Sequence, residues 1–141
     1  MKQRTGHMEA LRRVKELVEQ LNSEVDLVIV EGAHDSKALK LMGLSKPVLE
    51  ISKSKKPLFE VVDWVVERFR RKRVALLLDF DDEGEKLAAR LISEFSQRGV
   101  AIDLEVRESF RGILKNVGVK SIEGIALIKR AALEGEELEE A

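Results

Sequence analysis

The sequence feature that most constrains the fold is an uninterrupted apolar run over residues 74–78 that stops on an acid, Asp79. A strand that helices cover on both faces of a parallel sheet has this composition. A second run of the same kind, residues 27–30, ends on Glu31 and Gly32. Because ligands bind beyond the carboxyl ends of parallel strands, both acids are expected at one accessible edge of the sheet.

Amphipathic helices are expected between these strands. Apolar residues recur at helical spacing in several segments, and Gly84 is expected at a turn or at a close approach of two backbone segments. The predicted helices begin near Met8, Ala38, Leu58, Asp82 or Glu83, Phe110 and Ile122, and two further predicted strands cover residues 48–51 and 100–106. This alternation predicts an α/β fold with a mainly parallel, Rossmann-like sheet of about four strands flanked by helices.

The chain is expected to form one domain with two terminal segments. Its 141 residues, 44% of them hydrophobic, are enough for one core, which we place in residues 8–133. Residues 1–7 show no periodicity and are expected to be a disordered N-terminus or the remnant of a tag. Residues 134–141 are rich in glutamate and are expected to form a disordered acidic tail.

Four acids crowd residues 79–83, directly after the apolar run. Asp79 and Asp81 are two positions apart, so in an extended segment both side chains would point to one side and could share a cation. Crowded carboxylates repel one another unless they are protonated, solvated or bridged by a hard cation, and Mg²⁺ with its oxygen ligands suits such a site. The dipole at a helix N-terminus also favours acids, which suffices to explain Glu85 but not the whole group.

Three lysines, Lys53, Lys55 and Lys56, follow the strand predicted over residues 48–51. They are expected either to hold phosphate groups near the acids or to be ordinary solvated surface. The net charge of the chain is −1, but its last eight residues hold five acids and no base. The rest of the chain is therefore mildly basic, which is compatible with RNA or DNA as a partner.

The composition excludes several classes of function. The chain has no cysteine, which excludes thiol chemistry and cysteine-bound zinc and favours a reducing, cytoplasmic compartment. No apolar run reaches membrane-spanning length, so no membrane partner is expected. His7 and His34 have no partner at metal-binding spacing, and a phosphate-binding P-loop motif is absent. The high content of Lys, Glu and Arg favours a thermophilic source.

The pair Glu31-Gly32, followed later by Asp79-x-Asp81, resembles the two motifs of the Toprim domain of topoisomerases, bacterial-type primases and several nucleases. Glu83 extends the match to the form found in topoisomerases, and the resemblance covers roughly residues 25–110. It implies that Asp79 and Asp81 hold Mg²⁺, or Mn²⁺ in its place, and that Glu31 binds the metal or transfers a proton. The further residues with implied roles are Glu83 as another metal ligand, and Asp35 and Gly32 as supports of the ligands.

The sequence also departs from that family's pattern. Phe80 stands where topoisomerases favour proline, and Asp82 stands where a basic residue is common. The chain contains no tyrosine, so it cannot by itself cut DNA through a covalent tyrosine link. The resemblance therefore implies a small stand-alone Toprim protein, most similar in organisation to the ribonuclease-type members.

The predicted function is Mg²⁺-dependent cleavage or transfer of phosphodiester bonds in RNA or DNA. One alternative is a Toprim-fold module that binds nucleic acid or assembles with a partner without catalysis, either as a homodimer through the helix that contains Trp64 or with another protein. A second alternative is a haloacid-dehalogenase-type phosphatase, with Asp79 as nucleophile and Asp81 as acid. It is less favoured because Glu31-Gly32 precedes the Asp pair and Glu83 replaces the usual threonine.

Overall fold

Four parallel strands form the centre of the molecule. A computed structural model describes residues 2–140 of the chain, and the side chains of residues 6–134. The strands are β1 (Leu27–Val30), β2 (Val48–Glu50), β3 (Arg73–Leu76) and β4 (Ala101–Ile102), in the order β2-β1-β3-β4. All three pairings are parallel. The predicted α/β class and four-stranded parallel sheet are confirmed.

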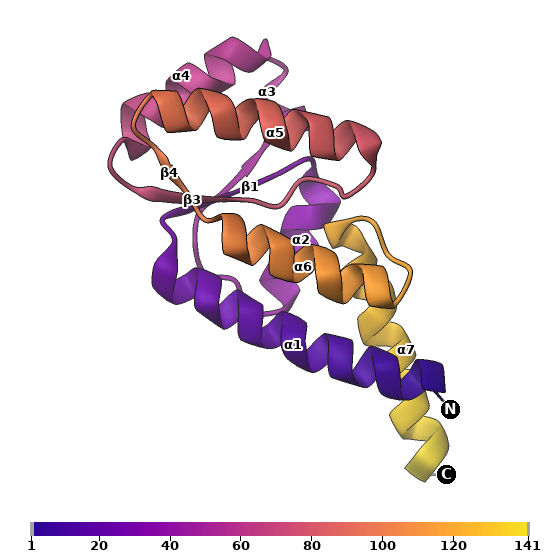
Figure 1. The fold of residues 1–141 in the computed structure, drawn as a ribbon. Helices are drawn as coiled ribbons and strands as arrows, with labels where there is room; N and C mark the ends of the chain where they lie inside the picture. The colour runs from indigo at the N-terminus through magenta and orange to yellow at the C-terminus, as the bar shows by residue number, and fades with distance from the viewer. Residues whose placement is uncertain (1, 141) are drawn as a thin grey trace.

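Helices cover both faces of this sheet (Figure 1). One face packs against α1 (Lys2–Glu24), α2 (Ala33–Leu41), α6 (Leu104–Asn116) and α7 (Ile125–Glu140). The other face packs against α4 (Leu58–Phe69) and α5 (Asp82–Gln97). Two short elements, α3 (Ile51–Ser54) and the 3₁₀ helix η1 (Ile122–Gly124), lie in the connections. Within residues 2–140, no helix combines the length and the apolar content that crossing a bilayer requires.

The two faces divide the strand residues between two cores. Successive side chains of β1 and of the β3 segment point to opposite faces of the sheet. Because helices cover both faces, the side chains on each face must be apolar. The core beneath α1 and α6 contains Val28, Val30, Ala75 and Leu77, and the core beneath α4 and α5 contains Leu27, Ile29, Val74, Leu76 and Leu78. Burial on both faces explains why these runs are continuously apolar and confirms the prediction made from them.

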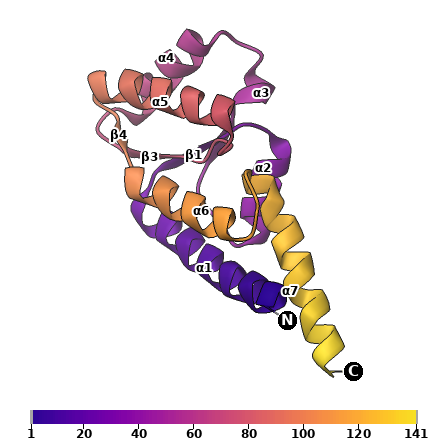
Figure 2. The ribbon, with the colours of Figure 1, turned by 45° about the vertical axis from the view of Figure 1, so that its right-hand side comes forward.

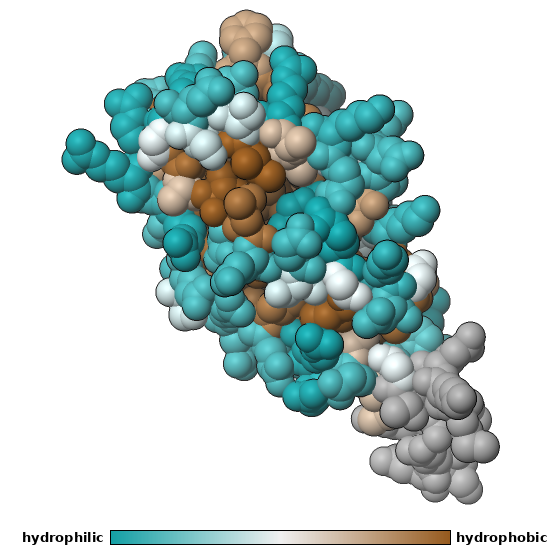
Figure 3. All heavy atoms as spheres, in the orientation of Figure 1, coloured by the Kyte–Doolittle hydropathy of each residue, from teal (hydrophilic) through white to brown (hydrophobic). Residues whose placement is uncertain are grey.

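The strand predicted over residues 100–106 is wrong. β4 contains only Ala101 and Ile102, and α6 begins at Leu104. The reason is Asp103, whose Oδ1 atom accepts a hydrogen bond from the backbone N–H of Val106 at 3.1 Å and so caps the N-terminus of α6. The short β4 ends the sheet on this side, and Figure 3 shows apolar side chains gathered between α5 and α6 there.

Other element boundaries differ less. Ile51, predicted as the end of a strand, instead begins α3. The first helix starts at Lys2, ahead of the predicted start at Met8, and α7 continues to Glu140 within the segment predicted as a tail. Residues 1 and 141 lie outside the described residues. α1 packs against both α6 and α7, and Figure 2 shows the start of α1 beside α7.

Gly84 brings the start of α5 against the end of the β3 segment. A Cβ atom at this position would lie 2.1 Å from the backbone oxygen of Asp79, far inside van der Waals contact. The predicted close approach of two backbone segments is therefore present, and it places the first turn of α5 directly against the backbone of Asp79.

Replacing Gly84 with alanine should destabilise the fold by about 2 kcal/mol or more, because two backbone segments must separate. Gly112 provides a matched control, since it lies within α6 and a Cβ there meets nothing within 4 Å. Gly112→Ala should gain about 0.5–1 kcal/mol from helix propensity. Urea unfolding of both variants measures the difference, and equal stabilities would contradict the close approach at Gly84.

Candidate functional site

Glu31 and Asp79, the acids predicted to converge, follow the two central strands β1 and β3. From β1 the chain continues outward to β2, and from β3 it continues outward to β4 on the opposite side of the sheet. β1 is followed by α2 on one face of the sheet, and β3 is followed by α5 on the other, so their connections separate and leave an opening. The pairing of the two strands continues past β3, where the N–H of Leu77 bonds to the carbonyl oxygen of Ile29 at 2.8 Å. As a result, Oε1 of Glu31 accepts a hydrogen bond from the backbone N–H of Asp79 at 3.3 Å.

The carboxyl groups of Glu31 and Asp79 also interact directly. Burial, followed by the hydrogen bond to the Glu31 side chain and the negative charges of Glu31, Asp35 and Asp81, raises the pKa of Asp79 to about 7. Near neutral pH the Asp79 carboxyl group is therefore partly protonated. A divalent cation that binds beside these carboxyl groups would displace this proton.

Asp81 and Glu83 lie on the solvent side of this pair. Oδ1 of Asp81 accepts a hydrogen bond from the N–H of Gly84 at 2.7 Å, so Asp81 caps α5. Glu83 is exposed in the first turn of the helix. Glu31, Asp81 and Glu83 line one open hollow of about 270 Å³, together with Ile51, Ser52 and Leu87.

Asp35 and Gly32 fix the start of α2. The Asp35 side chain is only 5% exposed, and its two oxygens accept hydrogen bonds from the N–H groups of Gly32 at 3.1 Å and Glu123 at 2.9 Å. Burial raises the pKa of Asp35, and these two hydrogen bonds oppose the rise. Asp35 therefore ties the loop after Glu31 to η1, which is a supporting position.

The donor groups fit a hard cation, although they are not yet gathered around one. Among the side chains of residues 6–134, no three Asp, Glu or His groups are already arranged as a metal site. Three of the acids accept backbone hydrogen bonds: Glu31 from Asp79, Asp81 at the cap of α5, and Asp35 between α2 and η1. Glu31 and Asp79 supply carboxylate oxygens, which are the ligands that Mg²⁺ or Mn²⁺ prefers, and binding of the cation would displace the proton of Asp79.

Sequence reasoning missed Arg107, which holds the backbone behind the acids. Its side chain is 3% exposed, and its guanidinium donates hydrogen bonds to the carbonyl oxygens of Leu76 at 3.1 Å, Leu78 at 2.9 Å and Asp79 at 3.2 Å. It also pairs with the carboxylate of Glu85. Burial lowers the pKa of Arg107, and the contact with Glu85 opposes that shift. The partners of Arg107 lie about 30 positions earlier in the chain, so the sequence around residue 107 gave no sign of this role.

Arg111 completes the arrangement one turn further along α6. Its guanidinium bonds to both oxygens of Glu85, at 2.7 and 2.8 Å. The ring of Phe80 lies 4.5 Å from the guanidinium carbon of Arg107 and 5.7 Å from that of Arg111. Phe80 is one of the departures from the Toprim pattern, and its ring packs on these two arginines. The only signal in the sequence was the i, i+4 spacing of the two arginines.

The three predicted lysines flank the acids without entering the hollow. The α3 helix is tied to the acidic edge, because the N–H of Ser52 donates a hydrogen bond to the backbone oxygen of Glu31 at 2.9 Å. Lys53, Lys55 and Lys56 are exposed on and after this helix. Lys53 and Lys56 line a second hollow that contains Trp64, and Lys55 does not line it.

Replacing Asp79 with asparagine should stabilise the protein at high pH. Folding raises the pKa of Asp79 to about 7, so ionisation opposes folding; the penalty is absent below about pH 4 and grows as the pH rises to 7. With solvent screening, the gain in Asp79→Asn should be on the order of 1 kcal/mol at pH 8 and near zero at pH 4. Urea unfolding at both pH values tests this. The exposed Asp82→Asn serves as control, and a variant less stable than wild type at pH 8 would refute the assignment.

Arg107→Met should cost about 3 kcal/mol or more, because three carbonyl oxygens lose a buried donor and Glu85 loses one of its two partners. Arg111→Met removes a more exposed partner of the same carboxylate, so its cost should be about 1 kcal/mol. Thermal and urea unfolding compare the two variants. Losses of the same size would show that Arg107 does not support the backbone beneath Asp79.

Comparison with known proteins shows the family. No protein-family model matches the chain. It is 33% identical over 119 residues to the UPF0292 protein of Methanocaldococcus jannaschii, covering 83% of this chain and 90% of that protein. It is also 33% identical over 119 residues to the UPF0292 protein of Thermococcus gammatolerans, covering 84% of this chain and 83% of that protein. Both sources are thermophilic archaea, in line with the composition.

A solved structure shares the fold. A protein from Aquifex aeolicus superimposes with a TM-score of 0.61 and 31% sequence identity, over 81% of this chain and 95% of that one. This similarity supports the parallel sheet and its flanking helices. Given the identity to the archaeal proteins over most of both chains, the protein belongs to the UPF0292 family.

Proposed function

We propose that this protein is a Mg²⁺-dependent enzyme that cleaves or transfers phosphodiester bonds in RNA or DNA, with a site of the Toprim type. The observation behind the proposal is the hydrogen-bonded pair of Glu31 and Asp79, contributed by adjacent parallel strands at the switch point of the sheet. Both residues belong to the two motifs that resemble the Toprim family. The contact between these distant segments is what that resemblance requires.

Each acid has a role that its position supports. Asp79 and Asp81 would hold the cation, and Glu83 would be a further ligand. Asp81 and Glu83 line the acidic hollow with Glu31, and Asp79 lies beside it, joined to Glu31 by a hydrogen bond. A bound Mg²⁺ would supply neutralisation of the negative charge at the scissile phosphate. Glu31 is oriented by the N–H of Asp79 at the same edge of the sheet, so it is placed to bind the metal or to transfer a proton at the leaving oxygen.

The shape of the site favours a polymeric substrate. The acidic hollow is shallow and open, whereas sites for small molecules enclose most of their ligand. Lys53, Lys55 and Lys56 stand beside it on α3 and the following loop, where they can contact phosphates of a strand that passes over the acids. An open acidic centre beside exposed lysines suits a nucleic-acid backbone.

A second candidate is a module that binds nucleic acid, or a protein partner, without catalysis. It is favoured by one observation, the engagement of Asp81 and Asp35 in backbone hydrogen bonds that fix helix starts. In this case the acids would serve the fold, and binding would not need a divalent cation.

Cleavage assays on a structured RNA and on nicked DNA distinguish the two candidates. Wild type should cleave with Mg²⁺ or Mn²⁺ and stop on addition of EDTA. Asp79→Asn and Glu31→Gln should each lose at least about 100-fold in rate, because each removes a metal ligand or the proton-transfer group. Asp82→Asn is the matched control, since this exposed acid begins α5 outside both the hollow and the hydrogen-bonded pair of Glu31 and Asp79. Equal cleavage by wild type and Asp79→Asn would remove the enzyme proposal, and tight binding unaffected by EDTA without turnover would favour the module.

A further inference from the structure

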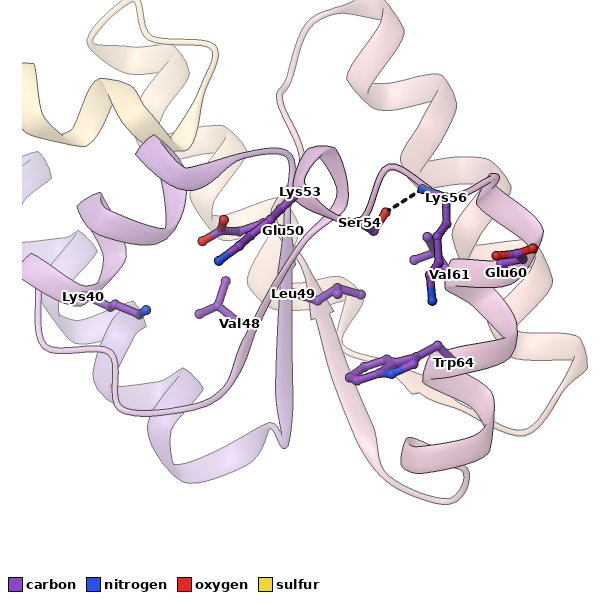
Figure 4. A pocket seen from close by; sticks show the side chains of 10 residues that line it. All are labelled: Lys40, Val48, Leu49, Glu50, Lys53, Ser54, Lys56, Glu60, Val61 and Trp64. Carbon is purple, nitrogen blue, oxygen red and sulfur yellow. Dashed lines mark hydrogen bonds between the residues drawn. The ribbon is translucent and has the colours of Figure 1, made fainter.

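A second hollow of about 440 Å³ lies along β2, outside the acidic site. β2 is the last strand on its side of the sheet, and Val48 and Leu49 contribute to the lining (Figure 4). The hollow extends from Lys40 on α2 to Trp64 on α4. Its other lining residues are Glu50, Lys53, Ser54, Lys56, Glu60 and Val61. It therefore combines an apolar floor, an aromatic side chain and several cationic groups.

Trp64 is held in place but not buried. The residue is 36% exposed. The guanidinium carbon of Arg68 lies 4.5 Å from the centroid of the indole ring, and Nη1 of Arg68 donates a hydrogen bond to the Trp64 backbone oxygen at 3.3 Å. The ring of Phe69 lies 6.1 Å away, inclined by 39°. These contacts fix the ring while it still lines the hollow.

The charges around the ring favour an anionic ligand. Lys40, Lys53 and Lys56 line the hollow against Glu50 and Glu60. In Figure 4 the side chain of Lys56 extends toward Trp64, whereas that of Glu60 points away from the hollow. The end of the hollow at Trp64 is therefore positively charged beside an aromatic ring, which is the combination that binds single-stranded nucleic acid.

The hollow at Trp64 and the acidic hollow lie on the same short helix, α3. Ile51 and Ser52 of α3 line the acidic hollow, and Lys53 and Ser54 of the same helix line the hollow at Trp64. One helical turn separates the two, so a single extended strand can occupy both. A phosphate over the acids would then be followed, a short way along the strand, by a base at Trp64.

We propose that this hollow is a subsite for single-stranded nucleic acid, in which an unpaired base stacks on Trp64 and the flanking phosphates contact Lys53 and Lys56. This subsite rests on the proposed function, because that function makes a nucleic acid the ligand. The subsite further requires that the substrate has an unpaired segment next to the scissile bond. A base within a duplex is stacked on its neighbours and has no free face for the indole ring. A fully paired duplex therefore cannot use this subsite.

The chain provides its own probe for this subsite. Trp64 is its sole tryptophan and it has no tyrosine, so intrinsic fluorescence excited at the indole band reports on Trp64 alone. Wild type is titrated with oligothymidylate and oligouridylate in EDTA, which prevents turnover, and binding is followed in parallel by the anisotropy of a labelled oligonucleotide. The single strands should quench Trp64, and a duplex of equal length should not.

Variants separate stacking from a general effect on the surface. Trp64→Leu should weaken binding of the single strand at least about fivefold, and Trp64→Phe should restore most of it, because base stacking on an aromatic ring contributes roughly this much or more. Phe59→Leu is the matched control, since Phe59 lies on the same helix, is 64% exposed and does not line the hollow. It should bind as wild type. Circular dichroism confirms that each variant is folded.

The outcomes distinguish this inference from the proposed function. Binding that neither quenches Trp64 nor weakens in Trp64→Leu would overturn the subsite and leave the proposed function standing. Quenching without any cleavage would support the subsite and remove the enzyme proposal. Failure of wild type to bind any oligonucleotide in EDTA would overturn the subsite, and failure to bind or cleave with Mg²⁺ as well would overturn both. Self-association of wild type that Trp64→Leu abolishes, without an effect of nucleic acid on fluorescence, would instead identify an interface between copies of this chain.

Discussion

The parallel pairing of β1 with β3 is the constraint on which the rest of the structure depends. It aligns Leu27 with Val74 and Ile29 with Leu76, and this register brings Glu31 beside Asp79. A slip of one residue would turn buried side chains to the opposite face and move one acid away from the other. The two apolar cores prevent this slip because each face of the sheet accepts only one set of side chains. The chemistry at the edge is thus fixed by packing beneath it.

The positive charges near Glu31 and Asp79 belong to Arg107 and Arg111, which pair with Glu85 and not with these two acids. Arg107 and Arg111 neutralise Glu85, and Arg107 also binds the carbonyl oxygens that lead to Asp79. Among the described side chains, no lysine or arginine forms an ion pair with Glu31 or Asp79. The fold therefore satisfies the backbone at the end of β3 and leaves the carboxyl groups in front of it available. This separation of the supporting arginines from the acidic pair is compatible with the proposed cation site.

The sequence was sufficient to predict the features that follow from local pattern. Continuous apolar runs indicated buried parallel strands, and Gly84 and the acids after each run indicated a close approach at their carboxyl ends. The strand expected over residues 100–106 failed because alternating apolar residues also fit a two-residue strand followed by a helix capped by Asp103. Arg107 could not be predicted, since its partners are backbone oxygens about 30 positions away, which no local pattern marks. Asp35 was recognised as an acid near the site, but its bond to Glu123, 88 positions later, was not.

Two long-range hydrogen bonds have a consequence for how the chain matures. The N–H of Phe80 bonds to the carbonyl oxygen of Lys120, and Asp35 accepts the N–H of Glu123. Both loops that present the acids thus depend on the segment before α7, near the end of the chain. This segment follows all four strands in the sequence, and Ile122 and Ile125 belong to the core on one face of the sheet. The loops after β1 and β3 can therefore reach their final positions only when this segment has packed, so the acidic edge and the core on that face are completed together.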